Sequence, residues 1–81
     1  MDFFKMDKYQ SIEENLLYDA KVLYKLLKKG KSMHIDELFD LFIEEQGVTL
    51  SLNIERILYL ALTFLYAHNL IAFNTNMVKR L

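Results

Sequence analysis

The stretch RILYLALTFLYAHNLIAFNTNMVKRL, residues 56–81, decides the fold of this 81-residue chain. It opens within an apolar helical pattern that starts after Ser51, a suitable N-cap, and runs to residue 68 or 69. Two short apolar runs then flank a polar Asn-Thr-Asn triplet at 74–76. Because asparagine tolerates the positive φ that tight hairpins need, this tail predicts a β-hairpin that ends with the chain.

Residues 11–29 form the first predicted helix. Ser11 and Glu14 have the capping-box spacing, in which each side chain binds a backbone N–H of the first turn. Lys28, Lys29 and Gly30 suit its C-terminal end, since basic side chains complement the helix dipole and glycine accepts a left-handed cap.

A second amphipathic helix follows the short connection KSMH, which is compatible with a small strand. Its apolar positions recur at i, i+3, i+4 and i+7 from Ile35 to Phe42, and Gly47 is placed to end it. Three helices followed by a hairpin predict a mainly α, α+β fold of the winged helix-turn-helix class over residues 11–81. Residues 1–10 are interpreted as an N-terminal arm.

The composition indicates a protein that has a partner. Hydrophobic residues make up 53% of the chain, more than a domain of this size readily buries, and there is no cysteine for disulfides. The lack of cysteine suits a reducing cytoplasm, and the net charge of -1 gives no general attraction to nucleic acid or anionic membranes. No apolar stretch reaches the ~20 residues of a membrane span, so we expect a soluble cytoplasmic protein without membrane contact.

The third predicted helix lacks the side chains that read DNA. Its apolar residues cover roughly 200° of a helical wheel, about twice what a surface helix needs to meet its core, and we expect this arc to pack on the other two helices and the wing. They are Ile54, Ile57, Leu58, Leu60, Ala61, Leu62, Phe64 and Leu65. Base readout relies mainly on Arg, Lys, Asn and Gln, and only Asn53 and Arg56 qualify here.

The remaining strip of that helix presents Tyr59, Thr63 and Tyr66. Tyrosine is enriched at protein interfaces, so we expect this strip to bind a partner. The alternative is that the two rings pack under the N-terminal arm. In that case Phe3 and Phe4 of the arm become the partner-binding residues.

The charges are arranged against ordinary DNA docking. The second helix lies near the phosphates in a DNA-bound helix-turn-helix, and here it has no basic residue. Its carboxylates are Asp36, Glu37, Asp40, Glu44 and Glu45. The candidates for contact with a DNA backbone lie elsewhere and are Lys28, Lys29, Lys31, Lys79 and Arg80. Such side chains can touch phosphate without sequence preference, or they can simply be solvated.

No catalytic constellation is visible in the sequence. Gly30 and Gly47 are isolated, so there is no glycine loop for phosphate. His34 and His68 lie in separate elements without a partner at motif spacing, and we expect His68 to cap or pack. We therefore expect no enzymatic activity, no cofactor and no metal.

Three segments together resemble a known family: ENLLYDAKVLYKLL at 14–27, HIDELFDLF at 34–42 and ILYLALTFLYAHNLIAFNTNMVKRL at 57–81. The last is similar to the helix-to-wing pattern aL-x-fLy-x-x-x-x-I of the middle components of ABC-three-component systems. These are small winged-helix proteins encoded between an ABC/SMC-like ATPase and an effector, and the Lamassu-type bacterial defence systems are similar assemblies. The resemblance implies a subunit that binds the ATPase and helps to couple DNA sensing to the effector. The first ten residues match no part of the pattern.

Three functions are therefore compared. The leading one is an accessory subunit of an ATP-driven anti-phage or anti-plasmid complex, with an SMC-like ATPase subunit and an effector subunit as partners and a homodimer as the form in isolation. The second is a winged-helix transcription regulator, which would need a basic, polar reading helix. The third is a structural adaptor in an unrelated complex.

Overall fold

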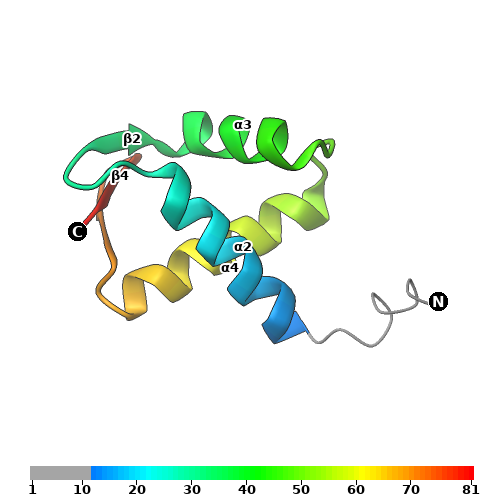
Figure 1. The fold of residues 1–81 in the computed structure, drawn as a ribbon, viewed down its shortest axis with the longest axis horizontal. Helices are drawn as coiled ribbons and strands as arrows, with labels where there is room; N and C mark the ends of the chain where they lie inside the picture. The colour runs from blue at the N-terminus through cyan, green and yellow to red at the C-terminus, as the bar shows by residue number, and fades with distance from the viewer. Residues whose placement is uncertain (1–11) are drawn as a thin grey trace.

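The computed structural model describes residues 12–81 (Figure 1). In chain order its elements are α2 (Ile12–Leu26), β2 (Ser32–His34), α3 (Ile35–Gln46), α4 (Leu52–Ala67), β3 (Ile71–Asn74) and β4 (Met77–Arg80). Within these residues the chain is a small α+β domain with three helices and a three-stranded antiparallel sheet. The predicted order of three helices followed by a hairpin is confirmed, and so is the short strand. The predicted arm at 1–10 and the capping residue Ser11 lie outside the described residues.

The first helix, α2, ends at Leu26 rather than at residue 29. The prediction that Lys28, Lys29 and Gly30 close this helix is therefore wrong. The physical reason is competition from the last strand: Lys29 forms a parallel bridge with Arg80, and the Gly30 N–H donates to the Arg80 carbonyl at 3.0 Å. Gly30 has the positive φ expected of it, 77°, but uses it in the connection to β2.

Helix α3 is closed at both ends by its own sequence. At its start, Nδ1 of His34 accepts a hydrogen bond from the Asp36 N–H at 3.2 Å. At its end, Gly47 has φ of 65° and donates its N–H to the Ile43 carbonyl, as the sequence predicts. The apolar positions Leu38, Phe39 and Phe42 are buried.

Capping residues also fix both ends of helix α4. The Ser51 hydroxyl accepts from the Ile54 N–H at 3.3 Å, which confirms the predicted N-cap. At the other end Asn69 has φ of 61°, and the Asn69 and Leu70 N–H groups donate back to the carbonyls of Tyr66 and Leu65, each at 3.0 Å. This is a Schellman arrangement with asparagine in the left-handed position.

The sheet has the strand order β2-β4-β3, with both neighbouring pairs antiparallel. Asn74 pairs with Met77, which leaves a two-residue turn at Thr75 and Asn76. The predicted hairpin is confirmed, but the asparagines do not supply the positive φ. Thr75 has it, at 59°, because Asn74 is still the last paired residue of β3.

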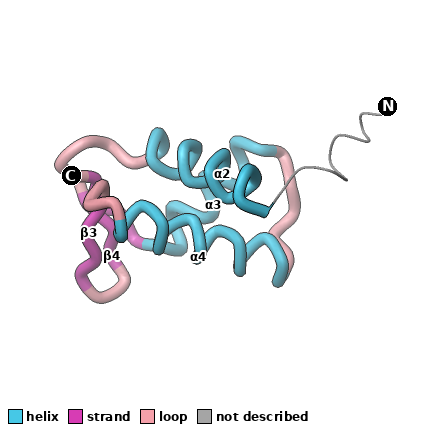
Figure 2. Tube along the Cα trace, turned by 90° about the horizontal axis from the view of Figure 1, so that it is seen from below, coloured by secondary structure: helices cyan, strands magenta, loops and turns pink. Residues whose placement is uncertain are grey.

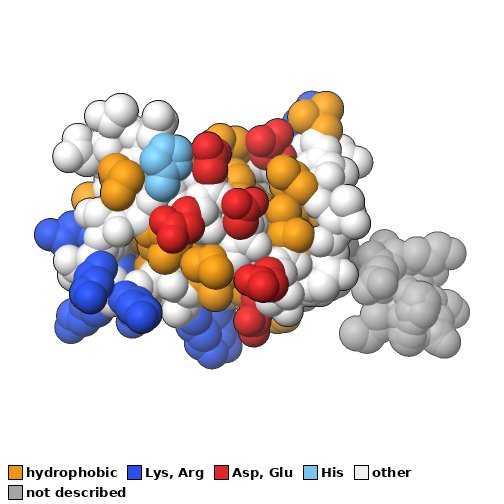
Figure 3. Space-filling view, turned by 90° about the horizontal axis from the view of Figure 1, so that it is seen from above, with side chains coloured by type: hydrophobic (Ala, Val, Ile, Leu, Met, Phe, Trp, Pro, Cys, Tyr) orange, Lys and Arg blue, Asp and Glu red, His pale blue; other side chains and the backbone are white. Residues whose placement is uncertain are grey.

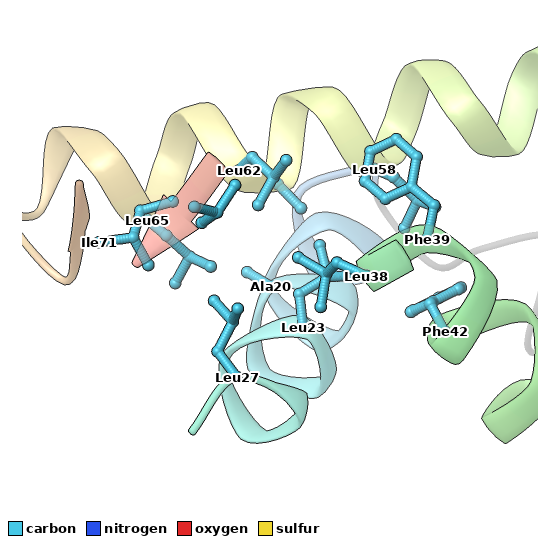
Figure 4. Packing of buried hydrophobic residues seen from close by; sticks show 12 residues of the cluster. Ala20, Leu23, Leu27, Leu38, Phe39, Phe42, Leu58, Leu62, Leu65 and Ile71 are labelled. Carbon is cyan, nitrogen blue, oxygen red and sulfur yellow. The ribbon is translucent and has the colours of Figure 1, made fainter. Parts of the chain in front are cut away.

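The core lies where the helices and the hairpin meet (Figure 4). Its buried members are Ala20, Leu23, Leu27, Leu38, Phe39, Phe42, Leu58, Ala61, Leu62, Leu65, Ile71 and Val78. Seen from below in Figure 2, the hairpin projects from the end of the molecule at which α4 finishes. None of the helices in residues 12–81 combines the length and apolarity needed to cross a bilayer.

Candidate protein-interaction surface

The side of α4 that faces away from the core is mostly apolar. We call this the α4 strip, and it consists of Leu52, Arg56, Tyr59, Thr63 and Tyr66, which lie on one line along the helix. All five are exposed, with Leu52 at 67%, Tyr59 at 47% and Tyr66 at 55% of full exposure. Exposed aliphatic and aromatic side chains gathered on one face are typical of a binding surface rather than of a solvated one.

Both tyrosine rings of the strip are supported from one side. The Tyr59 ring meets Phe39 of α3 edge to face, with ring centres 5.0 Å apart. The Tyr66 ring lies 5.3 Å from that of Phe73 in β3. Each ring is thus held by a neighbouring element and still presents about half of its surface. The two tyrosine side chains would therefore lose little conformational freedom when a partner binds them.

Thr63 lies between the two rings and is already satisfied. Its hydroxyl donates to the Tyr59 carbonyl at 3.0 Å, within the same helix. Because that donor has an acceptor, Thr63 needs no polar group from a partner. The small side chain leaves room for a larger one opposite.

The exposed apolar surface around the α4 strip is wider than the sequence predicts. The prediction that Leu60 faces the core is wrong, because 49% of the residue is exposed. Leu52, Leu70 and Phe73 are also exposed and were not assigned to the surface. The cause is that α2 and α3 cover less of α4 than its apolar arc would allow. Leu52 and Tyr66 each lie seven residues from Tyr59, which is about two helical turns. This spacing is the signal in the sequence that places Leu52 on the same face as the two tyrosines.

The face of the molecule over α3 is acidic (Figure 3). Acidic side chains are spread across this face with hydrophobic ones between them, whereas most of the lysine and arginine side chains in view gather towards one edge. The exposed carboxylates of α3 are Asp36, Glu37, Asp40, Glu44 and Glu45. A phosphate backbone beside α3 would be repelled.

Four of the five predicted phosphate-contacting residues are exposed: Lys28, Lys29, Lys31 and Lys79. The register brings Lys79 opposite Ser32, which directly follows the first three in sequence. The four therefore share one end of the domain, and we call them the lysine patch. Whether it touches DNA stays a prediction.

Arg80 does not belong to the lysine patch. Its guanidinium lies 4.0 Å from the centre of the Tyr24 ring and donates to the carbonyls of Tyr24 and Leu27. The side chain is half-buried against α2, at the base of the hairpin rather than at its tip. Of the five predicted backbone contacts, Arg80 is thus the one that is not exposed, and its contact with DNA stays a prediction.

The two histidines have local structural roles. His34 caps α3, with its Nδ1 also 3.8 Å from an Asp36 carboxylate oxygen. Nδ1 of His68 is 2.9 Å from the Phe64 carbonyl, and the two rings stack with centres 4.3 Å apart. His68 thus caps and packs, as predicted. In the part of the chain that the structure describes, no three His, Cys, Asp or Glu side chains come together as a metal site.

Two open hollows lie on the helices. One, of about 430 Å³, runs between α2 and α3 and is lined by Tyr18, Lys21, Val22, Lys25, Leu26, Glu45 and Gln46. The other, of about 170 Å³, is bordered by Asp19 and by apolar residues of α3 and α4. Burial there raises the pKa of the Asp19 carboxyl. Phe3 and Phe4, the alternative partner-binding residues, lie outside the described residues.

The chain is similar to one curated protein, the uncharacterized protein YydC of Bacillus subtilis (strain 168). The two are 52% identical over 80 residues, which is 99% of this chain. The chain spans only 59% of the length of that relative. No family model matches the chain, and no solved structure matches it.

Proposed function

We propose that this chain is a winged-helix subunit that binds protein, and that it does so through the α4 strip. The order of its elements is helix, strand, helix, helix, strand, strand, and the hairpin strand β4 lies between β2 and β3. In the winged-helix interpretation the β3–β4 hairpin is the wing, and α4 occupies the place of the recognition helix.

The observation that carries the proposal is the chemistry of the α4 strip. A recognition helix that reads bases needs several of Arg, Lys, Asn and Gln along its outer face. Here the α4 strip carries two half-exposed tyrosines, an exposed leucine, a threonine and one cation, Arg56, and the only other base-reading candidate of α4, Asn53, is exposed beside the strip. Aromatic anchors of this kind dominate the energetics of protein interfaces.

Electrostatics disfavours the rival function, a free-standing transcription regulator. Ordinary docking would place α3 near the phosphate backbone, with five exposed carboxylates on that helix. The lysine patch lies apart from these carboxylates, at one end of the domain. It suits contact with phosphate regardless of the DNA sequence. DNA contact is therefore an auxiliary property in this proposal.

The assembly that we propose is an ATP-driven complex. The resemblance to the middle components of ABC-three-component systems supports an SMC-like ATPase as the protein partner and an effector as the third member. In such a complex, which would work in the cytoplasm, this chain performs no chemistry. It couples the ATPase, which senses DNA, to the effector of an anti-phage or anti-plasmid response.

Co-purification tests the proposal. We expect an SMC-like ATPase to be encoded beside the gene of this chain. The full chain is co-expressed with that ATPase, affinity-tagged, and an unrelated tagged ATPase serves as the control. We expect a complex with the first and none with the second. In parallel, the isolated chain is titrated with duplex DNA at physiological salt, where we expect weak binding without sequence preference. A nanomolar, sequence-specific site, or failure to bind the neighbouring ATPase, would overturn the proposal in favour of the regulator or the unrelated adaptor, respectively.

A further inference from the structure

The α4 strip has the spacing of a coiled-coil seam. Its five positions are separated by four, three, four and three residues. Alternating steps of three and four keep side chains on one line along a helix, which is the arrangement that receives a second helix. The strip therefore fits a helix better than it fits a loop.

We propose that the helix bound by the strip is α4 of a second copy of this chain, packed antiparallel. The inference rests on the proposed function, in which this strip binds protein: the homodimer is the form of the isolated chain, and the ATPase takes the place of the second copy in the complex. In the antiparallel register centred on residue 61, Arg56 faces Tyr66 of the second copy and Tyr59 faces Thr63. Each pair occurs twice, because the arrangement is two-fold and uses the same surface on both copies.

The two pairs are chemically complementary. A large tyrosine meets a small threonine whose hydroxyl is already bonded within its own helix. An arginine meets a tyrosine ring, and an arginine over a ring is a favourable cation–π contact. The fold already contains one such contact, between Arg80 and Tyr24. No charge is left without a favourable neighbour in this seam.

Charge also selects the antiparallel direction. Arg56 is the one charged residue of the α4 strip. In a parallel pair it would face Arg56 of the second copy, and like charges in direct opposition are unfavourable. In the antiparallel register the two Arg56 positions are ten residues apart along the helix axis, or about 15 Å, which exceeds the screening length in physiological salt.

The exposed apolar area of the strip is small. Two half-exposed tyrosines and Leu52 offer roughly 300 Å² of apolar surface per copy, less than half of the ~800 Å² that one side of a standard interface buries. The apolar strip can thus form the centre of an interface but not a large one. We expect a reversible dimer that dissociates on dilution.

Sedimentation velocity of the full chain from micromolar to millimolar concentration tests the dimer. We expect wild type to dimerise, and Tyr66→Arg to weaken dimerisation at least tenfold by placing an arginine opposite Arg56 of the second copy. Adding Arg56→Glu to Tyr66→Arg should restore the dimer, because each new carboxylate then faces a new guanidinium. The matched control is Tyr18→Arg, a tyrosine of equal exposure, 54%, on α2, which should dimerise like wild type. A monomeric wild type, no rescue by the second substitution, or equal loss in the control overturns the proposal.

Disulfide cross-linking tests the register, since the chain has no cysteine of its own. Arg56→Cys and Tyr66→Cys are prepared as separate single variants. Mixing them should give a cross-linked pair, whereas each alone should not, because like positions lie about 15 Å apart and a disulfide needs Cα atoms within about 7 Å. Cross-linking of Arg56→Cys with itself would show parallel packing and overturn the proposal, as would a mixture that fails to cross-link.

The outcomes separate the dimer from the proposed function. A chain that stays monomeric but co-purifies with the neighbouring ATPase overturns the dimer and leaves the proposed function in place. A dimer with the expected register that binds no ATPase supports this inference and counts against the complex.

Discussion

The guanidinium of Arg80 lies over the Tyr24 ring, 4.0 Å from its centre, and so joins the last strand to the first helix. The same group donates to the carbonyl oxygens of Tyr24 and Leu27, 56 and 53 positions earlier in the chain, at 3.4 and 3.2 Å. Carbonyls at the C-terminal end of a helix have no intrahelical donor left. Arg80 therefore closes α2 from the far end of the sequence.

Arg80→Ala should destabilise the domain by about 1–3 kcal/mol, because it removes a cation–π contact and leaves two part-buried carbonyls without their donor. Lys79→Ala, one residue away but exposed, should change stability by less than about 0.5 kcal/mol. Urea unfolding followed by circular dichroism measures both. Equal effects of the two substitutions would mean that the contact between Arg80 and α2 contributes nothing to stability.

The contrast between Leu60 and Leu62 tests which side of α4 is buried. Leu62→Ala opens a cavity in the core and should cost about 2–5 kcal/mol of unfolding free energy. Leu60→Ala truncates a half-exposed side chain and should cost well under half as much. The same denaturant experiment compares these two leucines of one helix. A larger loss for Leu60 would show that the apolar arc faces the core as the sequence alone suggested.

Asp19→Asn should stabilise the domain at neutral pH. Burial raises the pKa of the Asp19 carboxyl in the folded protein, so the folded state holds this proton more tightly than the unfolded chain does. The unfolding free energy therefore falls as pH rises from the unfolded pKa through the raised folded one, and stays lowered above it. Asparagine removes that cost, so the advantage of the variant should be full at neutral pH and vanish near pH 3. Unfolding curves at both pH values decide this, and an advantage that grows on acidification would contradict the assignment.

Lys79→Glu should weaken DNA binding by the assembled complex without affecting its sequence preference. One phosphate contact contributes about 0.9 to the slope of log affinity against log salt, so losing the contact should lower the slope by about one. Anisotropy titrations of duplex DNA over a salt series measure the slope. Lys21→Glu, also exposed but on α2 about two helical turns before Lys28, is the control. An unchanged slope would remove Lys79 from the DNA contact.

The local chemistry of the helix ends could be predicted from the sequence. Ser51 caps α4 and Gly47 ends α3 because each acts on atoms within a few residues of itself. The end of α2 could not be predicted in this way. The end of α2 depends on the hydrogen bonds of Arg80 and on the bridge at Lys29. Both contacts exist only once the last strand has packed against α2.

The candidate surface could likewise be predicted from the sequence only in part. A helical wheel separates Tyr59, Thr63 and Tyr66 from the core positions of α4. It does not show how much of the apolar arc the other helices cover, which is why Leu60 was misplaced. It also gives no contact across elements, so the support of Tyr66 by Phe73 of the hairpin required the fold.

The most direct test of the central claim is hydroxyl-radical footprinting of Tyr59 and Tyr66, read by mass spectrometry. The rings are measured in dilute free protein, in the assembled state with its protein partner, and with excess duplex DNA. If the α4 strip binds protein, both tyrosines become protected in the assembly and stay reactive with DNA, while the exposed Tyr18 on α2 reports any general change. Protection of the two rings by DNA, or unchanged reactivity of both in the assembly, would contradict the claim.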